Sequence, residues 1–167
     1  MKIAVATDHT GLAYGGVFEA VVKHIEDLGH ECVNYGPDHL DMGDDYPDFM
    51  FPAAHAVANG DCHAGVILGG SGQGEAMAAN RVKGIRCTVF YGEAVAKNAV
   101  DAEGDVSRDP YEILRLSRQH NHANMLSLAT RFLELDEVKN AISIWLETHY
   151  SSSERHVRRV KELDMDE

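Results

Sequence analysis

The sequence predicts an α/β fold, a three-layer sandwich in which a five-stranded, mainly parallel sheet lies between two layers of helices. Short apolar runs alternate along the whole chain with stretches whose apolar residues recur every three or four positions. The 167 residues suit one domain, and neither an internal repeat nor a Pro-, Gly- and Ser-rich linker divides them. We therefore expect a single Rossmann-like or flavodoxin-like domain over residues 1–167, with its site at the carboxyl ends of the strands.

The N-terminal part of the chain gives the first strand, helix and strand of this pattern. Residues 2–7 form a short apolar run that predicts a buried strand, and residues 8–11 form a polar turn after it. Apolar residues recur at helical spacing over 17–28, and Gly29 follows, which is typical of a helix and its end. Residues 32–35 then predict a second short strand.

The middle of the chain repeats the pattern around a glycine-rich turn. Residues 36–47 are rich in Asp and Gly and are expected to form a loop, and residues 53–58 are expected to be helical. Residues 65–68 predict the third strand, which runs into the glycines of 69–74. A helix over 75–82 is expected next.

The C-terminal part predicts two more strands and two more helices, with one irregular stretch between the strands. Strands are expected at 86–90 and 125–128, and helices at 138–145 and 154–163, the last of them basic. About thirty residues separate the fourth strand from the polar segment before the fifth, which is more than a helix and a turn need. We therefore expect an acidic insertion at about 91–110 that lengthens or splits one helix.

Composition limits the partners and the compartment. The formal charge of −12 repels nucleic acid and anionic membrane, so neither is an expected partner. No apolar window approaches the roughly 18 residues of a membrane span, and the N-terminus lacks the apolar stretch of a signal peptide, so we expect a cytoplasmic protein. The three cysteines show no CxxC spacing and are expected to be reduced thiols.

The glycine loop Gly69-Gly70-Ser71-Gly72-Gln73-Gly74 is the strongest local indication of a site. It follows a predicted strand and opens a helix, so its bare N–H groups are expected to converge on an anion, a phosphate or a reaction oxyanion. A tight strand-to-helix turn that only needs small residues is the simpler alternative. A dinucleotide loop is disfavoured, because it usually follows the first strand.

Two ionisable side chains near this edge have the character of an acid or a base. Glu75, in the first turn of the next helix, either caps that helix or takes a proton from a carbon whose carbonyl lies against the loop. His120 is expected on a loop before the fifth strand, where it can face the cleft. His120 and His122 lack a third ligand at a telling spacing, so no metal site is expected.

Seven sequence blocks together resemble ribose-5-phosphate isomerase B and its galactose-6-phosphate isomerase relatives, in order from residue 2 to about 163. No single block is specific, but seven in the correct order are. The blocks are Val5 to Gly11, Asp45-Tyr46-Pro47, Gly70 to Glu75 with Ala78 to Arg81, Gly84-Ile85-Arg86, Ser117 to Asn121 with Asn124, Arg131, and Arg155-His156-x-x-Arg159.

The resemblance implies an enzyme that interconverts an aldose phosphate and a ketose phosphate through a cis-enediolate, without a metal or an organic cofactor. Ribose 5-phosphate and ribulose 5-phosphate are the default pair, and tetrose, other pentose and hexose phosphates remain open. Many members of the family have a cysteine base where this chain has Gly69, and a second group has a glutamate after Ser-Gly-x-Gly. Glu75 matches the base of that second group.

The resemblance also implies the remaining roles and the assembly. His120 corresponds to the acid–base that opens the furanose ring. The members are homodimers, sometimes paired into homotetramers, with a cleft shared between subunits, so His120 would serve the neighbour's Glu75. The anion hole would consist of Ser71 and the N–H groups of Gly70, Gly72 and Gly74. The substrate contacts would be Asp8, Tyr46 and Asn121 to the sugar, and His9, Arg131, Arg155 and Arg159 to the phosphate.

Two other functions stay open at this point. A non-catalytic flavodoxin-like module could bind a sugar phosphate or a nucleotide through the same loop, and the missing cysteine at position 69 favours it. An interaction protein could keep the fold and dock through the acidic insertion, which would leave the shared presence of Glu75, His120 and Arg131 unexplained.

Overall fold

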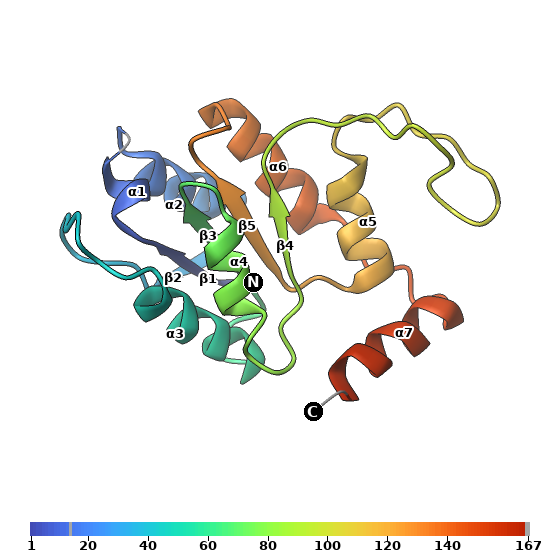
Figure 1. Cartoon of the computed structure of the whole chain (residues 1–167), viewed down its shortest axis with the longest axis horizontal. Helices are drawn as coiled ribbons and strands as arrows, with labels where there is room; N and C mark the ends of the chain where they lie inside the picture. Colours follow the sequence, from blue (N-terminus) through green and yellow to red (C-terminus); the bar gives the residue numbers. More distant parts are fainter. Residues whose placement is uncertain (14, 166–167) are drawn as a thin grey trace.

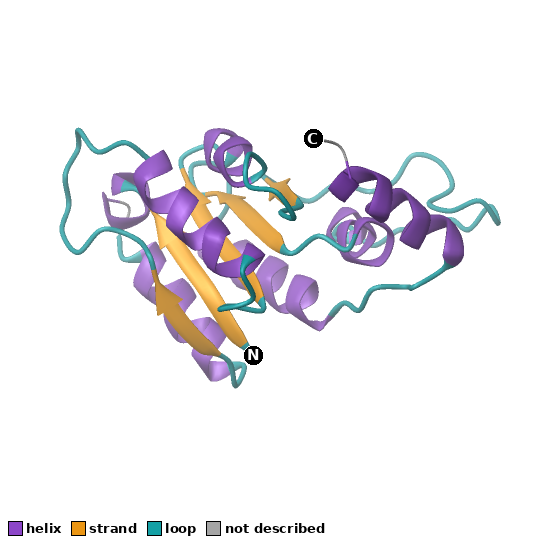
Figure 2. Ribbon diagram, turned by 90° about the horizontal axis from the view of Figure 1, so that it is seen from below, coloured by secondary structure: helices purple, strands orange, loops and turns teal. Residues whose placement is uncertain are grey.

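The computed structural model describes residues 1–13 and 15–165, and it confirms the predicted three-layer α/β fold (Figures 1 and 2). All five strands are parallel and lie in the order β2-β1-β3-β5-β4. The strands are β1 (Lys2–Thr7), β2 (Glu31–Asn34), β3 (Ala64–Gly69), β4 (Cys87–Phe90) and β5 (Met125–Ala129).

Helices cover both faces of the sheet. Buried residues of α2, α5 and α6 form one core cluster with the sheet, and those of α3 and α4 form a second cluster on the opposite face. The last helix, α7, packs on α5. No helix among the described residues is long and apolar enough to cross a bilayer. The helices are α1 (His9–Ala13), α2 (Val17–Asp27), α3 (Pro47–Ala58), α4 (Gln73–Ala79), α5 (Glu112–Asn121), α6 (Leu135–Glu147) and α7 (Glu154–Met165).

The two cores follow from the two-residue period of the strands. In β1, Ile3 and Val5 enter the cluster with α2 and α6, whereas Ala4 and Ala6 enter the cluster with α3 and α4. All four side chains are fully buried. A strand that is apolar on both sides therefore reads as one continuous apolar run, which is why the sequence identifies it.

Three helices differ from the sequence-based expectations. The predicted polar turn 8–11 is largely the short helix α1, and α3 begins at Pro47, inside the predicted loop, because proline suits the first turn of a helix. Residues 91–110 contain no helix or strand and lead into α5, so they form a loop and do not lengthen or split a helix, contrary to the prediction from the sequence. His120 therefore lies in the last turn of α5 and not on a loop, which corrects the earlier expectation.

Candidate active site

The carboxyl ends of three neighbouring strands bring together the first group of predicted site residues. The sheet register pairs Thr7 with Leu68 and Gly69 with Ala129, so β1, β3 and β5 end at the same level. Asp8 follows β1, the glycine loop follows β3, and Arg131 follows β5 at this edge. The predicted position of the site at the strand ends agrees with this arrangement.

The end of β5 fixes the backbone of the glycine loop. The carbonyl oxygen of Gly69 accepts hydrogen bonds from the N–H of Thr130 at 2.9 Å and from its Oγ1 at 3.0 Å. The carbonyl of Gly70 accepts the N–H of Arg131 at 3.1 Å. Because these carbonyls are bonded to the β5 side, the loop is held in one conformation against the sheet.

The centre of the loop is held by a buried serine that the sequence reasoning missed. Ser127, fully buried in β5, donates through Oγ to the carbonyl of Gly72 at 2.7 Å. Gly72 has a φ of 70°, a left-handed conformation that favours glycine. Ser71 turns its Oγ back into the loop, where it accepts the N–H of Gln73 at 3.3 Å. A serine inside an apolar strand is the signal that could have identified Ser127.

Three glycines of the loop each lie in close contact with a predicted site side chain. A Cβ on Gly70 would lie 2.9 Å from Cζ of Arg131, and a Cβ on Gly74 would lie 2.9 Å from Cζ of Tyr46. Both distances are shorter than real side chains tolerate, so bare backbone is required for these approaches. The pairs are Gly69 with Glu75, Gly70 with Arg131 and Gly74 with Tyr46.

Glu75 lies in the first turn of α4 and is only 5% exposed. Among the described residues, nothing donates a hydrogen bond to its buried Oε2. Burial raises the pKa of Glu75 above its ordinary value, and the negative charge of Asp8 adds to this, although the charge of Arg131 acts in the opposite direction. A desolvated carboxylate with a raised pKa is a competent base for a weakly acidic C–H group.

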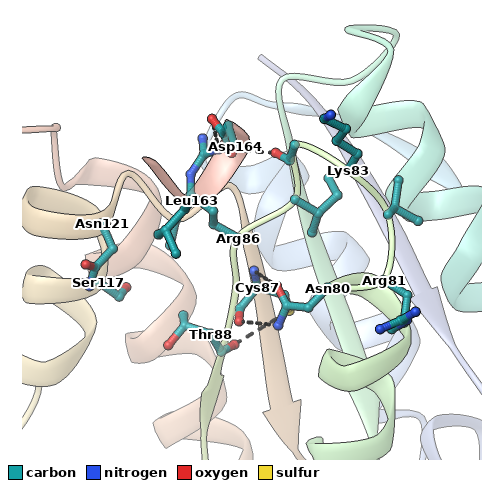
Figure 3. Close-up of a pocket in the computed structure, with 14 residues that line it drawn as sticks. Asn80, Arg81, Lys83, Arg86, Cys87, Thr88, Ser117, Asn121, Leu163 and Asp164 are labelled. Carbon is teal, nitrogen blue, oxygen red and sulfur yellow. Dashed lines mark hydrogen bonds and ion pairs between the residues drawn. The ribbon is translucent and has the colours of Figure 1, made fainter. Parts of the chain in front are cut away.

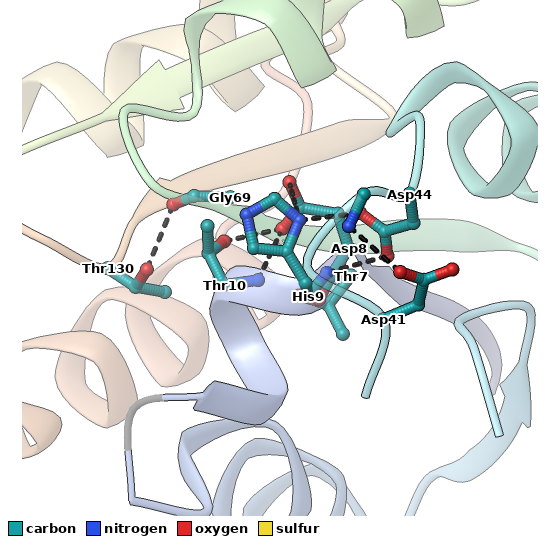
Figure 4. A network of polar contacts seen from close by, with 9 residues as sticks. Thr7, Asp8, His9, Thr10, Asp41, Asp44, Gly69 and Thr130 are labelled. Carbon is teal, nitrogen blue, oxygen red and sulfur yellow. Dashed lines mark hydrogen bonds and ion pairs between the residues drawn. The ribbon is translucent and has the colours of Figure 1, made fainter. Parts of the chain in front are cut away.

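His9 is oriented by Asp44, which the sequence reasoning did not select (Figure 4). The backbone N–H of His9 donates to Oδ2 of Asp44 at 2.8 Å, and Nδ1 of the ring lies 2.5 Å from Oδ1 of the same carboxylate. The hydrogen bond that the His9 ring makes to Asp44 is the main reason that the pKa of His9 is raised. The other ring nitrogen, Nε2, points away from Asp44.

Asp8, His9 and Asp44 also place carboxylate and imidazole atoms within 4.8 Å of one another, a spacing that could suit a metal ion. Oδ1 of Asp8 already accepts two hydrogen bonds from Thr10, one from its N–H at 2.9 Å and one from its hydroxyl. Both oxygens of Asp44 face donors of His9. Hydrogen bonding accounts for this cluster, and we assign it no metal.

The second group of predicted site residues lies on α5 and α7. His120 and Asn121 of α5, together with Arg155 and Arg159 of α7, line a hollow of about 360 Å³ next to residues 99–102. Figure 1 shows α5 and α7 on the far side of β4 from α4 and the ends of β1 and β3. Within one chain, the two helices that carry these four residues thus lie across β4 from α4, which carries Glu75.

His156 packs against this second group of residues through a ring contact with His120. Its ring stacks on the ring of His120, with the centroids 4.1 Å apart and the planes 9° apart. His156 is buried, and burial lowers its pKa, as do the neighbouring His120, Arg155 and Arg159. A neutral imidazole beside two arginines avoids adding a third positive charge at this point.

A cavity of about 680 Å³ lies between the α4–β4 connection, α5 and the end of α7 (Figure 3). Of the predicted site residues it contains Asn121 alone. The guanidinium of Arg86 crosses this region and donates to both carboxylate oxygens of Asp164, at 2.9 and 3.0 Å. The Arg86–Asp164 ion pair therefore links α7 to the residues before β4, and neither Glu75 nor His120 lines the cavity.

Comparison with known proteins gives concordant matches over nearly the whole chain. A family model described as Ribose/Galactose Isomerase matches residues 3–104 and 108–163. A probable ribose-5-phosphate isomerase B of Mycoplasma genitalium is 32% identical over 97% of this chain and 93% of its own length. The ribose-5-phosphate isomerase B of Mycobacterium tuberculosis is 29% identical over 96% of this chain and 86% of its own.

Solved structures agree with these sequence matches. The type B ribose 5-phosphate isomerase of Trypanosoma brucei has a TM-score of 0.82 and 30% identity, covering 99% of this chain and 98% of that one. A crystal structure of the Mycoplasma genitalium ribose-5-phosphate isomerase B with bound ribulose-5-phosphate has a TM-score of 0.80 and 30% identity, covering 98% of this chain and 93% of that one.

Proposed function

The chain belongs to the ribose/galactose isomerase family, and we propose that it interconverts an aldose phosphate and the corresponding ketose phosphate, with ribose 5-phosphate and ribulose 5-phosphate as the substrate pair. The observation that carries the proposal is the buried Glu75 carboxylate, with its unpartnered Oε2, beside the glycine loop. The ribulose 5-phosphate bound to the Mycoplasma genitalium relative supports the five-carbon substrate.

In the proposed reaction, Glu75 takes the proton from C2 of the open-chain aldose, and the electron pair of that C–H bond moves toward the C1 carbonyl. The resulting enediolate carries negative charge on oxygen, which the N–H groups of the glycine loop stabilise. One such donor contributes about 3–4 kcal/mol to the transition state. Glu75 then returns the proton to C1 while the proton of the C2 hydroxyl passes to the C1 oxygen, so that C2 becomes the carbonyl of the ketose. A positioned base contributes about 10²–10⁴-fold.

The rest of the substrate is held by the two groups of residues described above. Asp8 and Tyr46 contact the sugar hydroxyls, and His9 and Arg131 supply positive charge at the strand ends. We propose that the chain forms a homodimer, or a homotetramer of paired dimers. In that assembly the partner brings His120 to open the furanose ring, Asn121 to contact the sugar, and Arg155 and Arg159 to bind the phosphate. The separation of the two groups within one chain supports this arrangement.

We also propose that the enzyme works in the cytoplasm. All three cysteines are free thiols in the structure. Burial raises the pKa of Cys32 to about 11, so its thiolate is scarcely populated at neutral pH. Unreactive, unpaired thiols suit a reducing compartment.

Proton exchange with solvent tests the proposed reaction directly. Incubation with ribose 5-phosphate in deuterated water is expected to place deuterium on the carbon next to the carbonyl, as measured by NMR. The reason is that a carboxylate base exchanges its proton with water between abstraction and return. A flavodoxin-like binding module would bind the sugar phosphate without exchange, and that result would overturn the proposal. Four- and six-carbon phosphosugars in the same assay define the preferred substrate.

Asp44→Asn is expected to shift the pH dependence of KM for the phosphosugar. Asp44 raises the pKa of His9, so the imidazolium persists as pH rises and is lost only when pH passes the raised value. The asparagine still accepts a hydrogen bond but carries no charge, so the rise in KM moves to lower pH. Measuring KM from about pH 6 to about pH 9 shows the shift. Asp41→Asn, in the same loop, is the matched control and keeps the wild-type profile.

A further inference from the structure

Gly69, the last residue of β3, leaves a space that three atoms of Glu75 fill. A Cβ built on Gly69 would lie 2.0 Å from Cδ of Glu75, 2.0 Å from Oε1 and 2.6 Å from Cγ. These overlaps are the most severe that the glycine loop shows. The carboxyl group of Glu75 thus rests directly on the backbone of the strand.

The backbone conformation does not explain a glycine at this position. The glycines with positive φ among the described residues include Gly72 and Gly84, and Gly69 is not one of them. An alanine could therefore adopt the conformation of residue 69 without backbone strain. The nearest obstacle is Glu75, since the three atoms closest to the position of a Cβ at residue 69 all belong to that side chain.

The overlap could not be relieved by moving the strand. β3 pairs with β1 on one side and with β5 on the other, and Gly69 is paired with Ala129. The carbonyl of Gly69 also accepts two hydrogen bonds from Thr130. A side chain at position 69 would therefore force the carboxyl group of Glu75 out of its place.

We propose that Gly69 is a positioning residue for the base, because its bare backbone provides the surface against which the Glu75 carboxylate is held beside the glycine loop. This inference rests on the proposed function for the role of Glu75 as the base. A consequence is that a side chain at position 69 and a carboxylate at position 75 exclude each other. Gly69 therefore leaves this volume to the carboxyl group of Glu75.

Gly69→Ala is expected to lower kcat by roughly 10²-fold or more with little change in KM, because displacement of a reacting group by about 1 Å has an effect of this size. The acidic limb of the profile of kcat against pH is expected to move to lower pH, since the displaced carboxylate loses part of the burial that raises its pKa. Wild-type kcat in Gly69→Ala would overturn the inference.

A stability cycle tests the steric part without reference to turnover. Gly69→Ala is expected to lower the urea midpoint of unfolding in the wild-type background and to have little effect in the Glu75→Ala background, where the new methyl group enters the vacated space. If Gly69→Ala does not fold, recovery of a folded double variant supports the same conclusion. An equal loss of stability in both backgrounds would overturn the inference, whether or not the proposed function holds.

Gly65→Ala is the matched control for this cycle. Gly65 lies on the same strand, and a Cβ there would lie 2.7 Å from Cε of Met125, with no atom of Glu75 among its nearest neighbours. The cost of Gly65→Ala is therefore expected to be the same with and without Glu75. Coupling to Glu75 at both glycines would mean that the effect is a general one of β3, which would contradict the assignment to Gly69.

Discussion

Glu75→Gln is expected to abolish nearly all turnover and, at neutral pH, to make the protein more resistant to unfolding. The amide has the shape of the carboxylate but cannot accept a proton from carbon, so we expect a loss of about 10³-fold or more in kcat. Binding of the phosphosugar is expected to remain, because the groups that hold the sugar and phosphate are unchanged. Steady-state kinetics and direct binding measurements separate the two effects.

The gain in stability follows from the direction of the pKa shift. Burial raises the pKa of Glu75 in the folded state above its value in the unfolded chain. Between the two values the folded state binds more protons, so the free energy of unfolding falls as pH rises through this window. The penalty is complete above the folded-state pKa and absent below the unfolded-state pKa. Glutamine is neutral throughout, so the advantage of the variant shrinks on acidification.

Glu19→Gln is the matched control for both readouts. Glu19 also lies in the first turn of a helix, α2, but its side chain is exposed. The same substitution there is expected to leave turnover unchanged and to cost a few tenths of a kcal/mol through the helix dipole. If Glu75→Gln kept wild-type turnover, Glu75 would not be the base.

The strands and the first group of site residues were accessible from the sequence because each depends on local pattern. The buried strands appear as continuous apolar runs, and parallel strands place their carboxyl ends at one edge of the sheet. Asp8, the glycine loop and Arg131 each follow such a run, so their meeting required no knowledge of distant contacts. Pattern and topology were therefore sufficient to predict that these residues lie at one edge of the sheet.

The helix that carries His120 could not be predicted in the same way. Leu114 and Ser117 are the buried residues of α5, and most of its other residues are polar, so the helix lacks the apolar content by which the others were identified. Distant contacts support the helix instead: the guanidinium of Arg118 lies 4.7 Å from the ring centroid of Trp145, and its Nε donates to the carbonyl of Thr148. Tertiary packing of this kind leaves no trace in a local window.

The residues that orient the site were missed for a related reason. Asp44 is one of several aspartates in an acidic loop, and its partner His9 lies 35 positions away. Ser127 interrupts an apolar strand, and its partner is the carbonyl of Gly72, 55 positions away. Each side chain becomes recognisable only when the fold provides its hydrogen-bond partner.

Mixing two inactive variants is expected to restore activity if the site is shared between subunits. Glu75→Gln damages the group at the strand ends, which consists of Asp8, the glycine loop with Glu75, and Arg131, and is called the strand-end group below. His120→Ala damages the group on α5 and α7. In a mixed dimer, one site combines the intact strand-end group of one subunit with the intact His120 of the other. Random pairing of equal amounts makes half of the dimers mixed, each with one working site in two, so about one quarter of wild-type activity should return.

Glu75→Gln mixed with Arg131→Ala is the control that gives this experiment its meaning. Both lesions lie in the strand-end group, so every site in every dimer contains one damaged copy of that group, and activity should stay at the level of the separate variants. Recovery with His120→Ala but not with Arg131→Ala requires that His120 reach the Glu75 of another chain, because no rearrangement within one subunit distinguishes the two mixtures. Absence of recovery in both mixtures, with mixed dimers present, would place all of the catalytic groups within one chain and contradict the shared site.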